Sequence, residues 1–133
     1  MLNRNNLVVL LLIALWLGTW AVKTGRINLP SVEPAVVDRV TYVYEKDQGG
    51  VPPAVAVALM ELNAAGSIVA TEFEDDTVDG DGEVPEQYKI ASGAATTIPC
   101  VVAQDGAVVV RVVPIDPAVP FAELKTIVLE AAK

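Results

Sequence analysis

Residues 96–113, TTIPCVVAQDGAVVVRVV, decide how this chain folds. A short apolar run is followed by Asp105-Gly106 and then by a second run of mostly β-branched residues, which is the pattern of a β-hairpin with a tight turn. Pro99 stands at the start of the first predicted strand, where its missing N–H does least harm. The segment therefore predicts two antiparallel strands.

Upstream of the hairpin, the chain predicts a strand, a helix and a second strand. Residues 40–44 are β-branched or aromatic throughout, as in a strand covered on both faces. Two prolines precede a run of helix-forming residues at 54–65, and Gly66 is placed to end that helix. Residues 67–74 then predict a strand, and this order favours two parallel strands joined by a right-handed crossover.

Downstream of residue 74 the chain predicts two more helices around the hairpin. Residues 75–83 form an acidic loop with glycines, and residues 84–92 predict a short helix that Gly93 stops. After the hairpin, apolar residues recur at helical spacing. They are Phe121, Leu124, Ile127, Val128 and Ala131. The predicted order of elements is β-α-β-α-β-β-α.

This order over residues 39–133, together with Ile98-Pro99 and the turn at Gln104-Asp105-Gly106, resembles the thioredoxin-like fold family. The resemblance implies an α/β three-layer sandwich with a mixed sheet, in which Pro99 follows a cis peptide bond and faces the family's active site. In that family a Cys-X-X-Cys motif opens the first helix. Here the matching segment, residues 47–52, reads DQGGVP, so the resemblance implies a redox-inactive member.

The N-terminus predicts a single transmembrane helix. Residues 5–22 carry no charge, and a helix of that length spans roughly 27 Å, enough for a bilayer core. Trp16 and Trp20 lie near one end, where aromatic residues meet the membrane surface. A cleaved signal sequence ending at Ala21 is the alternative.

We therefore expect three parts: a membrane anchor or signal sequence at 1–23, a linker at 24–38 and a thioredoxin-like domain at 39–133. The expected protein is single-pass, with its C-terminal domain on the extracytoplasmic side and residues 5–22 in the lipid bilayer.

Composition excludes several kinds of chemistry. The chain has one cysteine and no histidine, which excludes an internal disulfide, a Cys/His zinc site and histidine-based acid–base catalysis. Three of the nine Lys and Arg lie at or before Arg26, and all 17 Asp and Glu come later, so the rest of the chain carries a net charge of −11. Such a domain is not expected to bind nucleic acid.

Two loops are the candidate contact surface. The first contains Asp47, Gln48, Gly49 and Gly50, where the family's redox motif would stand, and the second contains Thr97 and Ile98, just before Pro99. The family geometry would place them side by side. An acidic surface there favours basic or polar protein partners and makes their binding sensitive to salt.

Two alternatives to a contact surface remain open. Cys100 is either the nucleophile of a monothiol redox protein or a small apolar strand residue. The acidic loop is either a solvated loop or a cation site with the spacing of an EF-hand. The ligands of that site would be Asp75, Thr77, Asp79 and Glu86.

The function expected from the sequence is that of a membrane-anchored, non-catalytic, thioredoxin-like structural or interaction subunit of a membrane or virion assembly. We expect protein partners and no cofactor. Because the chain has no Cys-X-X-Cys motif and no histidine, the sequence favours a protein without enzymatic activity. The monothiol redox protein and the cation-binding domain are the alternatives.

Overall fold

The computed structural model describes residues 33–133, so the predicted membrane anchor lies outside the described residues. No helix within 33–133 is long and apolar enough to cross a membrane. Residues Ala35–Lys133 form one compact unit. Val37 is buried in its core, so the chain joins the domain two residues before the first strand.

The domain is α/β, with a four-stranded mixed sheet and three α-helices in the described part of the chain. The strands are β1 (Arg39–Tyr44), β2 (Val69–Glu74), β3 (Cys100–Asp105) and β4 (Val108–Pro114), and the helices are α2 (Pro53–Ala65), α3 (Lys89–Ala94) and α4 (Phe121–Ala131). Short 3-10 turns, η1 (Lys46–Gln48) and η2 (Glu86–Tyr88), precede α2 and α3.

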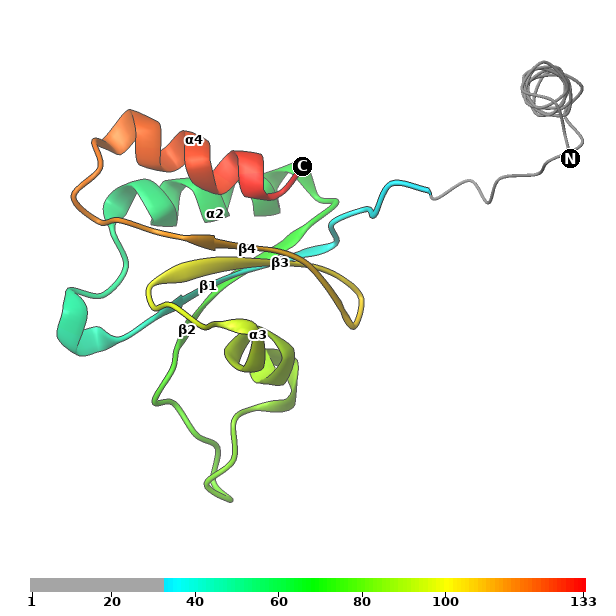
Figure 1. Ribbon diagram of the computed structural model, residues 1–133, viewed down its shortest axis with the longest axis vertical. Helices are drawn as coiled ribbons and strands as arrows, with labels where there is room; N and C mark the ends of the chain where they lie inside the picture. The colour runs from blue at the N-terminus through cyan, green and yellow to red at the C-terminus, as the bar shows by residue number, and fades with distance from the viewer. Residues whose placement is uncertain (1–32) are drawn as a thin grey trace, which may run out of the picture. The chain divides into compact units, whose positions relative to one another are not determined.

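The sheet has the strand order β2-β1-β3-β4. β1 runs parallel to β2 and antiparallel to β3, and β3 runs antiparallel to β4, as the predicted crossover and hairpin require. Helices α2 and α4 cover one face of the sheet and α3 covers the other (Figure 1). Each face has its own apolar core, one around Val55, Leu124 and Val128 and a smaller one around Phe73 and Cys100.

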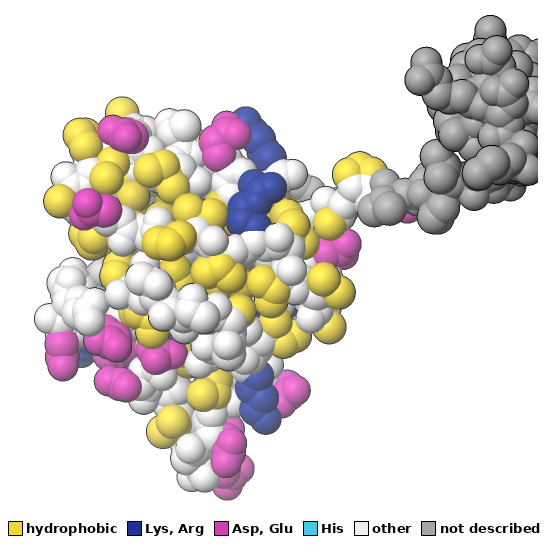
Figure 2. Space-filling model, in the orientation of Figure 1, with side chains coloured by type: hydrophobic (Ala, Val, Ile, Leu, Met, Phe, Trp, Pro, Cys, Tyr) yellow, Lys and Arg dark blue, Asp and Glu magenta, His cyan; other side chains and the backbone are white. Residues whose placement is uncertain are grey.

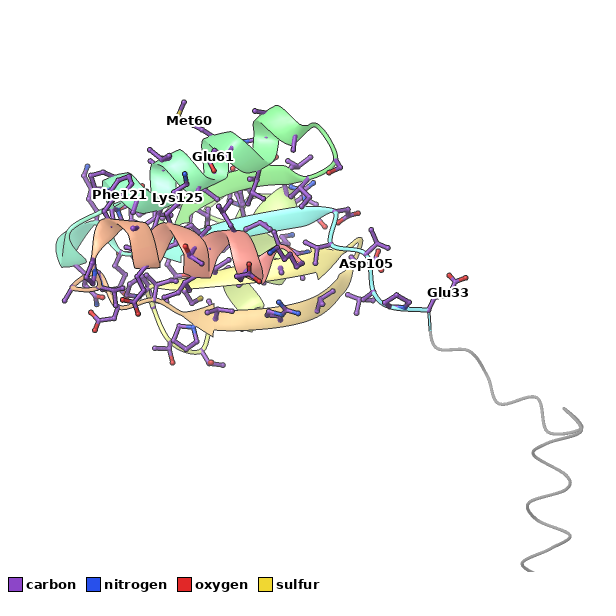
Figure 3. The ribbon with its side chains drawn as sticks, turned by 90° about the horizontal axis from the view of Figure 1, so that it is seen from above. Glu33, Met60, Glu61, Asp105, Phe121 and Lys125 are labelled. Carbon is purple, nitrogen blue, oxygen red and sulfur yellow. The ribbon has the colours of Figure 1, made fainter. Side chains whose placement is uncertain are left out.

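The central strands β1 and β3 are buried on both faces, which explains why their inner residues are mostly β-branched, aromatic or otherwise apolar. On the larger core's face, α2 and α4 lie next to each other, and Glu61 of α2 forms an ion pair with Lys125 of α4 (Figure 3). Both residues are partly exposed, so the pair contributes little to stability. The apolar residues beneath, Leu124 among them, hold the two helices together.

Three local predictions are wrong. Gly93 lies inside α3 instead of ending it. The helix ends at Ala94, and the next residue, Ala95, caps it by donating its N–H to the carbonyls of Ala91 and Ser92. Phe121 was expected in the core but is 52% exposed. The hairpin turn consists of Gly106 and Ala107, one residue later than predicted, because Asp105 still belongs to β3.

Two side chains outside the core hold together the end of the sheet where β1 and β2 begin. The Asp38 carboxylate accepts the N–H of Gly106 at 3.1 Å and so ties the start of β1 to the hairpin turn. The Asn63 amide, near the end of α2, makes two bonds to Ala70 of β2: its Nδ2 donates to the carbonyl at 2.7 Å, and its Oδ1 accepts the N–H at 2.9 Å.

Replacing Asn63 with alanine is expected to lower the free energy of unfolding by about 1–2 kcal/mol. Two hydrogen bonds at about 0.5–1.5 kcal/mol each are lost, and the better helix propensity of alanine offsets part of that loss. Urea unfolding followed by circular dichroism measures the change. Met60→Ala, one turn earlier on α2 at a 70% exposed position, is the control and should stay within about 0.5 kcal/mol of the parent. Equal losses in both variants would contradict the role of the Asn63 amide.

Candidate functional site

The candidate loops leave the same end of the sheet. Val43, near the end of β1, pairs with Cys100, the first residue of β3, so the segment after β1 and the segment before β3 begin side by side. The chain enters β1 at the opposite end, where Arg39 pairs with Gln104. Helix α2 also begins at the loop end (Figure 1).

The loop that follows β1 is exposed and shaped by two glycines. Asp47, Gln48 and Gly49 are exposed, whereas Gly50 is half-buried. Gly49 and Gly50 have φ angles of +105° and +70°, which residues with a side chain rarely adopt. The Gln48 amide donates a hydrogen bond to the Glu45 carboxylate at 2.8 Å. The loop thus presents polar side chains on a backbone that needs both glycines.

The second loop joins α3 to β3. Thr97 is exposed, and Ile98 is half-buried against the smaller core. The Ile98–Pro99 peptide bond is cis, and the Pro99 carbonyl accepts the N–H of Ile115 at 3.0 Å, which extends the β3–β4 pairing. Within residues 33–133 no hydrogen bond or ion pair joins this loop to the one that follows β1. The structure therefore places the two loops at one end of the sheet without linking them.

The sulfur of Cys100 lies inside the smaller core. The residue is fully buried among Val43, Phe73 and Val102. Burial, and secondarily the Asp75 carboxylate, raises the pKa of the Cys100 thiol to about 11. A thiol acts as a nucleophile through its thiolate, and both effects oppose the thiolate. This environment suits a packing residue better than a redox centre.

We expect native Cys100 to react with an uncharged alkylating reagent about a hundredfold more slowly at pH 8 than the unfolded chain does. The thiolate fraction alone accounts for that factor, because the pKa of Cys100 rises from 9.0 to about 11 on folding. Mass spectrometry of full-length protein with and without urea measures both rates. Equal rates would restore the monothiol hypothesis.

The acidic side chains between β2 and α3 are engaged with different partners. Asp75 Oδ1 accepts a hydrogen bond from the Ser92 hydroxyl at 3.1 Å, which ties the end of β2 to α3. Asp79 Oδ1 accepts the backbone N–H groups of Asp81 and Glu83 at 2.9 and 3.1 Å. These bonds shape a surface turn (Figure 1).

The proposed cation ligands are not brought together. Besides the bonds of Asp75 and Asp79, Glu86 forms an ion pair with Lys89 at 2.9 Å, and Thr77 is exposed on the loop. In the described part of the chain no group of three or more Asp, Glu, Cys or His side chains is placed to hold a metal ion. The spacing of an EF-hand is present in the sequence, but its geometry is not.

Three residues that shape the surface were not singled out from the sequence. Ser92 and Asn63 bind groups 17 and 7 residues away, and Arg111 Nη1 donates to the carbonyl of Glu130 at 2.9 Å. The last bond caps the C-terminal end of α4 with a cation, a favourable arrangement for the helix dipole. A polar residue near the end of a helix or strand often makes a hydrogen bond that stabilises that end. Which group it bonds to depends on how the helices and strands pack, so the sequence alone does not identify the partner.

The fold and the site define an α/β domain that presents two exposed loops at one end of a four-stranded mixed sheet. No protein-family model, no curated protein and no solved structure matches this chain.

Proposed function

We propose that this protein is a membrane-anchored, non-catalytic protein-interaction subunit with a thioredoxin-like domain. Two helices on one face of the sheet, one helix on the other and the order β2-β1-β3-β4 support the assignment to that fold. The anchor is residues 5–22, with the domain on the extracytoplasmic side of a membrane or virion.

One observation carries the interaction role: the exposed loops stand at the end of the sheet opposite to the point where the chain enters the domain. Because the chain enters the domain at the other end, its point of entry leaves those loops free to meet a partner. The segment Asp47–Gly50 has no cysteine, and the only thiol of the chain is buried, so a binding role fits these loops better than a redox role.

The test is mild detergent extraction of the tagged full-length protein from native membranes, followed by mass spectrometry of its partners. We expect partners in a fixed ratio. Asp47→Lys should lower their yield severalfold, because it reverses a charge at the contact surface. Asp105→Lys is the matched control, since Asp105 is an equally charged, exposed residue at the hairpin end of the sheet (Figure 3), and it should leave the yield unchanged.

A protein that comes out alone and monomeric would overturn the proposed function. If both variants lose partners equally, the contact lies elsewhere on the domain, or partner binding depends on the net charge of the domain and not on Asp47.

A further inference from the structure

The two edges of the sheet differ in their accessibility to another strand. β2 and β4 are the edge strands. An edge strand presents unpaired N–H and C=O groups that accept an added strand unless something covers them. The two edges of this sheet differ in how far their outward backbone groups are occupied.

The β2 edge is obstructed. The N–H of Val69 bonds to Asp38, just before β1, and the N–H of Asp75 bonds to Tyr44 at its end. The alternate residues between Val69 and Asp75, beginning with Ala70, therefore direct their backbone groups outward. At Ala70, the first of these, the Asn63 amide occupies both the N–H and the C=O. Glu72 and Glu74 follow, and charged residues on an edge strand discourage pairing.

In the described part of the chain the β4 edge is open at its middle, although Pro114 and the β-bulge opposite Gln104 limit pairing at its two ends. The N–H of Ile115 bonds to Pro99, and this pairing alternates along the strand, so the backbone groups of Val112 point away from the sheet. Five of the seven residues of β4 are valines, and the other two are Arg111 and Pro114. Its one charged side chain, Arg111, bonds to the end of α4 at Glu130 and does not cover the edge.

A groove runs beside this edge, between β4 and α4, with a volume of about 450 Å³. Its apolar lining comes from Val113, Ile127 and Ala131. Its charged lining consists of the carboxylates of Glu123 and Glu130 and the guanidinium of Arg111, and the Glu130 carboxylate also forms an ion pair with Lys133. On the face shown in Figure 2, hydrophobic side chains gather over the middle, where β3 and β4 lie, and both acidic and basic side chains lie around them. The groove thus combines an apolar floor with one carboxylate, that of Glu123, which forms no ion pair in the described part of the chain.

We propose that β4 binds an extended segment of a partner protein, in which apolar residues alternate with lysine or arginine, as a fifth strand of the sheet. The backbone of that segment would pair with Val112. A basic side chain would lie across the apolar groove with its charged end at Glu123, as long basic side chains do on apolar surfaces. The proposal rests on the interaction function proposed above and names a second contact surface for it.

Charge favours a basic partner over a second copy of this chain. Residues 33–133 contain six Lys and Arg against 17 Asp and Glu, so two such domains repel each other. A basic segment is attracted by the same charge.

The test uses the full-length protein in detergent and a synthetic peptide of about eight residues, a typical strand length, in which valine and lysine alternate. Hydrogen–deuterium exchange followed by mass spectrometry reports which backbone amides become protected. We expect this peptide to slow exchange in Val108–Pro114. The matching valine–glutamate peptide should not change the exchange rate there.

Two edge prolines provide matched variants. Val112→Pro removes the outward N–H of β4 and should weaken peptide binding about tenfold or more. Glu72→Pro makes the same backbone change on the β2 edge. It should leave the affinity for the peptide within about twofold of the parent, because the peptide is proposed to pair with β4 and not with β2.

The proposal is overturned if the peptide protects only the acidic loop, if both prolines act equally, or if β4 is already protected by self-association of the chain. It is also overturned if Val112→Pro retains all native partners and binds the peptide normally, while the interaction function then stands. If the parent protein has no native partner, the interaction function fails, and the peptide experiment still decides whether β4 accepts a strand.

Discussion

Replacing Leu124 with alanine is expected to lower the free energy of unfolding by about 2–5 kcal/mol, the usual cost of a leucine-to-alanine cavity in a packed core. Leu124 is 2% exposed and lies in the larger core, among residues contributed by α2 and the sheet. A domain of this size is stable by only about 5–15 kcal/mol, so the variant loses a large part of its stability.

Phe121 is the matched control for Leu124, because it lies one turn earlier on the same stripe of α4. It is 52% exposed, so Phe121→Ala should change the free energy of unfolding by no more than about 0.5 kcal/mol. Urea unfolding of both variants, followed by circular dichroism, gives the comparison. A larger loss from Phe121 than from Leu124 would mean that the first turn of α4 is covered in the full-length protein.

Leu124 and Phe121 also show what helical periodicity in a sequence can and cannot predict about burial. Helical spacing correctly placed Leu124, Val128 and Ala131 in the core, because the stripe they form faces the sheet. It put Phe121 there as well, since periodicity identifies the buried face of a helix but not where the neighbouring elements end. Phe121 begins α4 beyond the packed layer.

Local chemistry predicted local features well. Gly66 ends α2 in the left-handed conformation with φ +79°, as its position after a run of helix formers indicated. Gly93, by contrast, sits in a helix of six residues, where the packing of Ala91 in the smaller core decides the extent of the helix more than one glycine does.

The candidate site was predictable only in part. The exposure of Asp47 and Gln48 could be expected, because the two adjacent glycines that follow them indicate a turn after β1. The difference between the sheet's two edges was not predictable, because it depends on Asn63 reaching Ala70 and on Arg111 turning toward α4. Both contacts join elements that only the tertiary fold brings together.

Alkaline pH is expected to destabilise the domain steeply between about pH 9 and 12. Burial is the largest cause that raises the pKa of Tyr42 from 10.0 to about 12, followed by repulsion from the negative charges that Cys100 and Tyr44 acquire on ionisation. The pKa of Cys100 rises from 9.0 to about 11. In this range the unfolded chain has released the two protons while the folded chain still holds them. The stability that these groups contribute below pH 9 is therefore lost as pH rises through their folded pKa values, by about 3 kcal/mol for each group.

Tyr42→Phe separates this effect from a general alkaline loss. The Tyr42 hydroxyl is buried and has no hydrogen-bond partner among the described residues, so its removal should leave stability at pH 7 unchanged or slightly higher. Between pH 10 and 12 the variant should lose about 3 kcal/mol less than the parent does. Cys100→Ala should reduce the loss between pH 9 and 11. Urea unfolding at each pH gives the slopes, and parallel curves for all three proteins would show that both groups are solvated in the folded state.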